Sequence, residues 1–106
     1  MTARSVSLWS RDGLNITASL RDSGALVIEG QHLSRGGEYE YTITVDAAKV
    51  PFVRQALGGK PDTDVLELLA ANAASIVHQG EKSWLESLGI TPEFWSHGDW
   101  RDTAGE

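Results

Sequence analysis

The sequence predicts an α+β fold in which a four-stranded antiparallel sheet is followed by helices that pack on one of its faces. Up to about Val45 the apolar residues alternate with polar ones, whereas after Ala47 they recur every three or four residues. The first pattern is typical of half-buried strands and the second of amphipathic helices. Two similar turns, Arg11-Asp12-Gly13 and Arg21-Asp22-Ser23-Gly24, punctuate the first half. Such short connections cannot hold a helical crossover, so we expect an antiparallel meander over about residues 5–46.

The alternation predicts which side chains face the core in each strand. In the first strand, Val6 and Leu8 are expected to face the core, with Trp9 on the other side. The second strand has the clearest pattern, with apolar residues at Leu14, Ile16, Ala18 and Leu20. In the third strand, Leu26 and Ile28 share a face. In the fourth strand, the side chains predicted to face the core are Tyr39, Tyr41, Ile43 and Val45. Those predicted to face solvent are Glu38, Glu40, Thr42 and Thr44. One face of the sheet should therefore be buried and the other exposed to solvent.

Three to four helices are expected after the sheet, over about residues 48–57, 63–78, 81–88 and 92–96. Pro51 suits the first turn of the first helix, and Gly58-Gly59 suits its end. Asp62 or Thr63 can cap the second and longest helix. Gly89 ends the third, and Thr91-Pro92-Glu93 has the order of a helix start for the fourth. Phe94 and Trp95 would then anchor a final helical turn.

Length and composition predict one small intracellular domain. A chain of 106 residues has the length of a single domain, which we place at residues 1–100, with residues 101–106 as a frayed tail. The absence of cysteine excludes disulfides and thiolate metal sites and suits a reducing cytoplasm. No signal-peptide pattern and no apolar run of membrane-spanning length is present. We therefore expect a cytoplasmic protein that does not bind membranes.

The charge is negative and unevenly distributed. Fifteen acidic and nine basic residues give a net charge of −6. Residues 1–45 hold four basic and five acidic groups, whereas residues 46–106 hold five basic and ten acidic groups. Direct nucleic-acid binding needs a positive surface, and none is visible. An acidic surface favours a basic protein partner, although negative charge can also serve solubility alone.

The sequence contains no catalytic or cofactor-binding motif. The histidines His32, His78 and His97 lack metal-ligand spacing, and we expect neither a metal nor a cofactor. Glu38 and Glu40 should lie about 7 Å apart on the wet face of one strand. If the protein were an enzyme, its site would be assembled from Glu40, His32 and Tyr41, and a pocket holding these groups would be required. We expect a protein that is not an enzyme.

Acidic residues and two tryptophans are the candidates for partner contact. Trp84 and Trp95 fall on apolar helical positions and are expected in the core, whereas Trp9 and Trp100 are candidates for exposed aromatic contacts. The acidic candidates lie either on the sheet, at Glu38 and Glu40, or on the helices, at Asp62, Asp64, Glu67, Glu81 and Glu86.

Several strings of the chain resemble small bacterial α+β proteins. They are Ser10-Arg11-Asp12-Gly13-Leu14, Leu26-Val27-Ile28-Glu29-Gly30-Gln31, Tyr39-Glu40-Tyr41 and Thr91-Pro92-Glu93-Phe94-Trp95. In these and in the order of strands before helices, the chain is similar to actinobacterial-type proteins and to immunity proteins of contact-dependent or polymorphic toxin systems. The resemblance implies an inhibitor that binds a cognate toxin, often a basic nuclease, inside the producing cell. It assigns no residue of this chain to a site.

The expected function is therefore that of a non-enzymatic immunity protein that binds and blocks a cognate, basic toxin. Its acidic side chains would occupy the cationic groove in which the toxin binds its substrate. The alternative is a homodimeric ligand-binding or regulatory module that associates through a sheet edge. The sequence leaves the binding face and the oligomeric state open.

Overall fold

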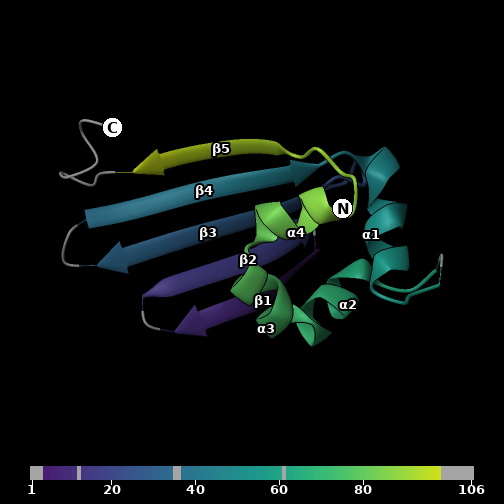
Figure 1. The fold of residues 1–106 in the computed structure, drawn as a ribbon, viewed down its shortest axis with the longest axis horizontal. Coiled ribbons are helices and arrows are strands. Elements are labelled where there is room, and N and C mark those ends of the chain that lie inside the picture. Colours follow the sequence, from purple (N-terminus) through teal and green to yellow (C-terminus); the bar gives the residue numbers. More distant parts are fainter. Residues whose placement is uncertain (1–3, 12, 35–36, 61, 99–106) are drawn as a thin grey trace.

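The structure is a computed structural model that describes residues 4–11, 13–34, 37–60 and 62–98. It consists of a five-stranded antiparallel sheet with four helices on one face. The strands lie side by side in chain order (Figure 1), and the whole helical segment is inserted between β4 (Gly37–Val45) and β5 (Glu93–Gly98). The α+β class and the antiparallel meander are confirmed. The expected number of strands was four, and the fifth is described below.

The first four strands follow the predicted alternation closely. They are β1 (Arg4–Arg11), β2 (Leu14–Leu20), β3 (Leu26–Ser34) and β4 (Gly37–Val45). Ile28 pairs with Ala18 on one side and with Ile43 on the other, so the apolar residues of neighbouring strands share one face. That face carries most of the buried core: the largest fully buried side chains of the sheet on it are Ile16, Leu26, Ile28, Ile43 and Val45.

A β-bulge in β1 changes the predicted position of Trp9. The register of β1 against β2 shifts between Ser7 and Trp9, and Val6 pairs with Ala18 while Trp9 pairs with Ile16. Because a bulge inserts one extra residue, the residues after it change face. Trp9 therefore lies on the helix-covered face, half-buried against the core, with the Arg11 guanidinium 5.5 Å from its ring centre. The expectation that Trp9 opposes the core face was wrong.

The helical segment begins with a 3₁₀ turn, η1 (Ala47–Lys49), and continues through α1 (Val50–Ala56), α2 (Val65–Ala71), α3 (Ala73–Gln79) and α4 (Glu81–Ser87). The long helix expected over residues 63–78 is divided at Asn72, whose backbone leaves the helical region. The side-chain Nδ2 of Asn72 donates a hydrogen bond of 2.8 Å to the Leu68 carbonyl oxygen. Asparagine side chains compete in this way with the helical hydrogen-bond pattern, which explains the break.

The last element is a strand, β5 (Glu93–Gly98), where a helix over residues 92–96 was expected. β5 pairs with β4 over six consecutive positions, from Thr44↔Glu93 to Tyr39↔Gly98. Pairing with β4 supplies backbone hydrogen bonds that a single isolated helical turn could not form. Adjacent aromatic residues also favour the extended conformation. Phe94 and Trp95 consequently point to opposite faces of the sheet.

The four helices cover only part of one sheet face. α2 and α3 pack against β1, and α2 also contacts β2. Figure 1 shows that the ends of the strands near the β1–β2 and β3–β4 turns extend past the helices. Within the described part of the chain, every helix is too short to traverse a lipid bilayer. The predicted tail at residues 101–106, and Trp100, lie outside the described residues.

Candidate functional site

The strongest candidate site is the sheet face that carries no helix. The strand register places on this face the side chains of Glu29, Glu38, Glu40 and Glu93, together with two exposed apolar residues, Leu33 and Trp95. Leu33 is 48% exposed and Trp95 is 56% exposed. We call these six residues the acidic face. Within the described strands, no lysine or arginine lies on this side of the sheet.

A shallow hollow marks the centre of this side. Its volume is about 320 Å³, and the side chains that line it belong to Asn15, Thr17, Glu29, Gln31, Glu40 and Thr42. Val27, which shares this side near the other end of the strands, is only 2% exposed, so along β3 the accessible part of the face extends from Glu29 towards Leu33. The hollow is polar, wide and open, which suits contact with another surface better than enclosure of a small molecule.

One amide side chain orders the two predicted glutamates of the sheet. Gln31 Nε2 donates hydrogen bonds to Glu38 Oε2 at 3.1 Å and to Glu40 Oε2 at 3.2 Å. Gln31 is directly opposite Glu40 on β4, so a single donor group bridges both carboxylates. An acceptor-only carboxylate keeps further lone pairs for other donors. The pair is therefore held in place and can still accept hydrogen bonds from a basic partner.

Three of the five acidic candidates on the helices have partners within the protein. Asp64 caps α2, accepting a hydrogen bond of 3.0 Å from the Leu66 N–H, and forms an ion pair with Arg4. Glu86 pairs with Lys82 one turn earlier at 2.7 Å. Glu81 is only 7% exposed and accepts a hydrogen bond of 2.8 Å from the Tyr41 hydroxyl. The remaining two, Asp62 and Glu67, are exposed.

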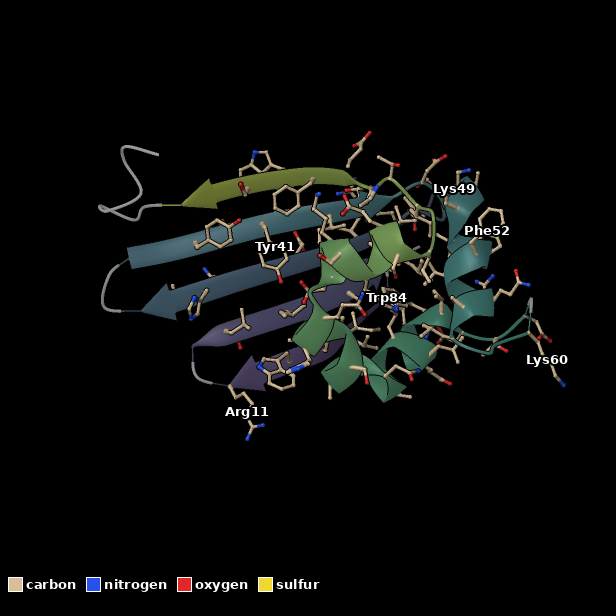
Figure 2. The ribbon with its side chains drawn as sticks, viewed as in Figure 1. Arg11, Tyr41, Lys49, Phe52, Lys60 and Trp84 are labelled. Atoms are coloured by element: carbon tan, nitrogen blue, oxygen red, sulfur yellow. The ribbon has the colours of Figure 1, made fainter. Side chains whose placement is uncertain are left out.

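Glu81 was expected to be an exposed contact, and that expectation was wrong. It is the first residue of α4, and its carboxylate accepts the hydrogen bond of Tyr41, which lies on the sheet beside α4 in Figure 2. Burial, followed by the nearby charge of Glu81, raises the pKa of the Tyr41 hydroxyl above its ordinary value. Tyr41 therefore stays protonated as a donor, and the Tyr41–Glu81 pair joins α4 to the sheet.

Asp64 stabilises the fold, and this has a measurable pH dependence. We expect Asp64→Ala to lower the free energy of unfolding by about 1 kcal/mol at pH 7, the usual effect of losing an N-cap. The Arg4 hydrogen bond lowers the pKa of the Asp64 carboxyl below its ordinary 3.8. A lowered carboxyl pKa gives stability that is present above the ordinary value and lost as the pH falls through the folded value. Urea unfolding at a series of pH values should show wild type and variant converging in acid, and a constant difference would contradict this prediction.

The residues of the hypothetical enzyme site do not converge. His32 pairs with Tyr39 and lies on the same side of the sheet as Tyr41, whereas Glu40 lies on the opposite side. The sheet backbone therefore separates the carboxylate from the other two groups. Across the described residues, no three histidine or acidic side chains are grouped so that they could hold a metal ion.

A smaller hollow lies on the helix-covered side, between β4, β5 and the start of α4. Three aromatic rings line it, with centres 6.0 Å apart for Tyr39 and Tyr41 and 6.3 Å apart for Tyr41 and Phe94. Lys82 Nζ lies 5.8 Å from the centre of the Phe94 ring. The volume of the hollow, about 220 Å³, is below the usual range for small-molecule sites, which begins at roughly 300 Å³.

Sequence reasoning missed Glu29, Glu93, Leu33 and Trp95 as members of the acidic face. Trp95 was expected in the core because it was placed on a helix. The adjacent aromatic residues Phe94 and Trp95 were the signal for a strand. Once β5 is a strand, its pairing with Thr42 places Trp95 on the same side as Glu29.

Comparison with known proteins found no matching family model, no significantly similar curated protein and no significantly similar solved structure. The similarity to immunity proteins rests on the strings quoted above and stays a prediction. The case for a function is carried by the geometry and the charge of the acidic face.

Proposed function

We propose that this chain is a non-enzymatic protein-binding domain that holds a basic partner protein against its acidic face. The observation that carries the proposal is the clustering of four carboxylates around exposed apolar side chains, on a sheet face without lysine or arginine in the described strands. Exposed aromatic residues are frequent energetic centres of protein interfaces, and opposite charge speeds encounter and selects the partner.

In line with the resemblance to immunity proteins, the partner we propose is a cognate toxin with a cationic substrate groove. Glu38 and Glu40 are held by Gln31 and remain able to accept hydrogen bonds from lysine or arginine. A protein that covers such a groove excludes the substrate and needs no catalytic group of its own. The absence of a converging Glu40, His32 and Tyr41 site is consistent with this role.

The alternative is a ligand-binding or regulatory module that uses the aromatic hollow of Tyr39, Tyr41 and Phe94. These rings could stack on a flat apolar ligand. The small volume of the hollow, about 220 Å³, favours the acidic face as the principal site.

Charge reversal on the sheet and on the helices tests which surface binds. The tagged protein is used to capture partners from a lysate of the organism that encodes it, at low and high salt, with mass-spectrometric identification. We expect Glu38→Lys/Glu40→Lys to weaken binding of the main basic partner by about tenfold or more, because two attractive contacts become repulsive. High salt should weaken binding to the wild type.

The matched control is Asp62→Lys/Glu67→Lys, which reverses two exposed acids on the helical side. This variant should retain the partner. Equal retention by both double variants would show that the acidic face is not the binding surface. Loss only in the helical variant would move the site to the helices. Circular dichroism of each variant checks that the fold is kept.

A further inference from the structure

The two edges of the sheet differ in how well they are protected against pairing with another strand. An edge strand presents unpaired N–H and C=O groups, and soluble proteins protect such edges with bulges, charges or covering elements. β1 has all three features: a bulge between Ser7 and Trp9, arginines at both ends and the helices α2 and α3 packed against it.

β5 lacks the bulge and the arginines found in β1; its acidic residue Glu93 stands at the first position, and Lys82 of α4 lies over Phe94. Its ladder with β4 is unbroken from Glu93 to Gly98, and β5 contains no proline, lysine or arginine. Among the described elements, only β4 is its neighbour in the sheet, and Figure 1 shows β5 as the outermost strand. Its two aromatic side chains are accessible, with Phe94 43% exposed on the helix side and Trp95 56% exposed on the acidic face.

We propose that the partner adds an extended basic segment to β5 as a sixth strand of the sheet. This inference rests on the proposed function and specifies how the partner reaches the acidic face. A strand paired with β5 would lie about 4.8 Å from it and would direct alternate side chains to the two faces. Backbone hydrogen bonds would supply affinity, and the alternate side chains would supply specificity.

The two sides of β5 select different side chains in the added strand. On the acidic face, lysine or arginine would lie next to Trp95 and Glu93, where cation–π attraction and opposite charge both act. On the other side, Phe94 is accessible but Lys82 lies over it. A second cation there would be repelled, so apolar residues are favoured. The preferred segment therefore alternates basic and apolar residues.

Charge favours such a segment over a second copy of this chain. A second copy also carries a net charge of −6, so two such edges repel each other as they approach. A basic segment instead neutralises the carboxylates that border β5.

The test uses a heptapeptide in which lysine alternates with valine, acetylated and amidated at its ends. Its control is the same peptide with every backbone amide N-methylated, which keeps the charge and removes the donors needed for pairing. Binding to the full-length, isotope-labelled protein is followed by NMR at low salt, together with hydrogen exchange of the β5 amides. The protein variants are Trp95→Thr and, as a matched exposed aromatic on α1, Phe52→Thr, whose side chain is 51% exposed in the wild type.

The proposal expects the unmethylated peptide to bind at least about tenfold more tightly than its control and to slow exchange in β5. Trp95→Thr should weaken this binding, and Phe52→Thr should leave it unchanged. Equal binding of both peptides, weakened by Glu38→Lys/Glu40→Lys, would overturn the strand pairing and leave the proposed function standing. Failure of the unmethylated peptide to saturate the protein below about 5 mM would also overturn the strand pairing. A dimer of the free protein that Trp95→Thr dissociates would assign the edge to a second copy and equally overturn it.

Discussion

Replacing Gly13 with alanine should lower the free energy of unfolding by about 3 to 4 kcal/mol, because three costs combine. Gly13 has a φ of +81°, a conformation that alanine adopts with strain. A Cβ atom at this position would overlap the backbone carbonyl oxygen of Leu33, which cannot rotate away as a side chain can. The shift needed to relieve this overlap would also break the hydrogen bond of 2.9 Å from the Leu33 N–H to the Gly13 carbonyl oxygen.

Gly58→Ala is the matched control for this prediction. Gly58 also has a φ of +81°, but a Cβ atom there would meet nothing within 4 Å. Its substitution should therefore cost only the backbone strain, about 1 to 2 kcal/mol. Urea unfolding followed by tryptophan fluorescence and circular dichroism measures both variants. Equal losses would mean that the contact between the β1–β2 turn and Leu33 adds nothing.

The strands could be predicted because burial imposes a two-residue period on them. Ile16 and Ala18 alternate with Asn15 and Thr17, and the structure buries the first pair and directs the second pair to the open side. A β-bulge does not alter composition, so the bulge before Trp9 left no comparable signal. It reversed the face of Trp9 and removed it from the set of exposed contacts.

The helical half was less predictable because short local signals compete there. Thr91-Pro92-Glu93 is a good helix start, yet pairing with β4 gives this segment a strand. Long-range pairing of this kind depends on where α4 ends and where the chain re-enters the sheet, and local spacing carries no information on either. The side-chain hydrogen bond of Asn72 similarly divided a helix whose apolar stripe continues across it.

Only part of the candidate site could be predicted, because part of it depends on long-range strand pairing. Glu38 and Glu40 follow from the alternation of β4 alone. Trp95 and Glu93 join them only through the register of β5, which no local pattern indicated. The sequence alone does not show whether an acidic side chain is free to bind a partner or supports the fold. Asp64 caps helix α2, and Glu81 joins α4 to the sheet through Tyr41.

The second large effect is expected at Gly30, which lies next to the Tyr41 ring on the helix-covered side of the sheet. Gly30 lies in β3 directly opposite Tyr41, and a Cβ atom there would overlap the Tyr41 ring. The ring cannot move without losing the hydrogen bond of 2.8 Å to Glu81, which would leave a carboxyl of 7% exposure without that donor. We expect Gly30→Ala to lower the free energy of unfolding by about 3 kcal/mol, through overpacking and an unsatisfied polar group.

A double-mutant cycle with Tyr41→Leu separates this steric effect from the intrinsic effect of the substitution. In the Tyr41→Leu background the ring and its hydrogen bond are already absent, so Gly30→Ala should cost less than about 1 kcal/mol or become stabilising, since alanine suits a strand better than glycine. Additive losses in urea unfolding would contradict the proposed contact.

Because Gly30 and Tyr41 act on the helix-covered side, whereas Glu38 and Glu40 lie on the other, Gly30→Ala should destabilise the protein without weakening the partner binding of its folded fraction. A matching loss of affinity would instead place the binding surface on the side of the aromatic hollow.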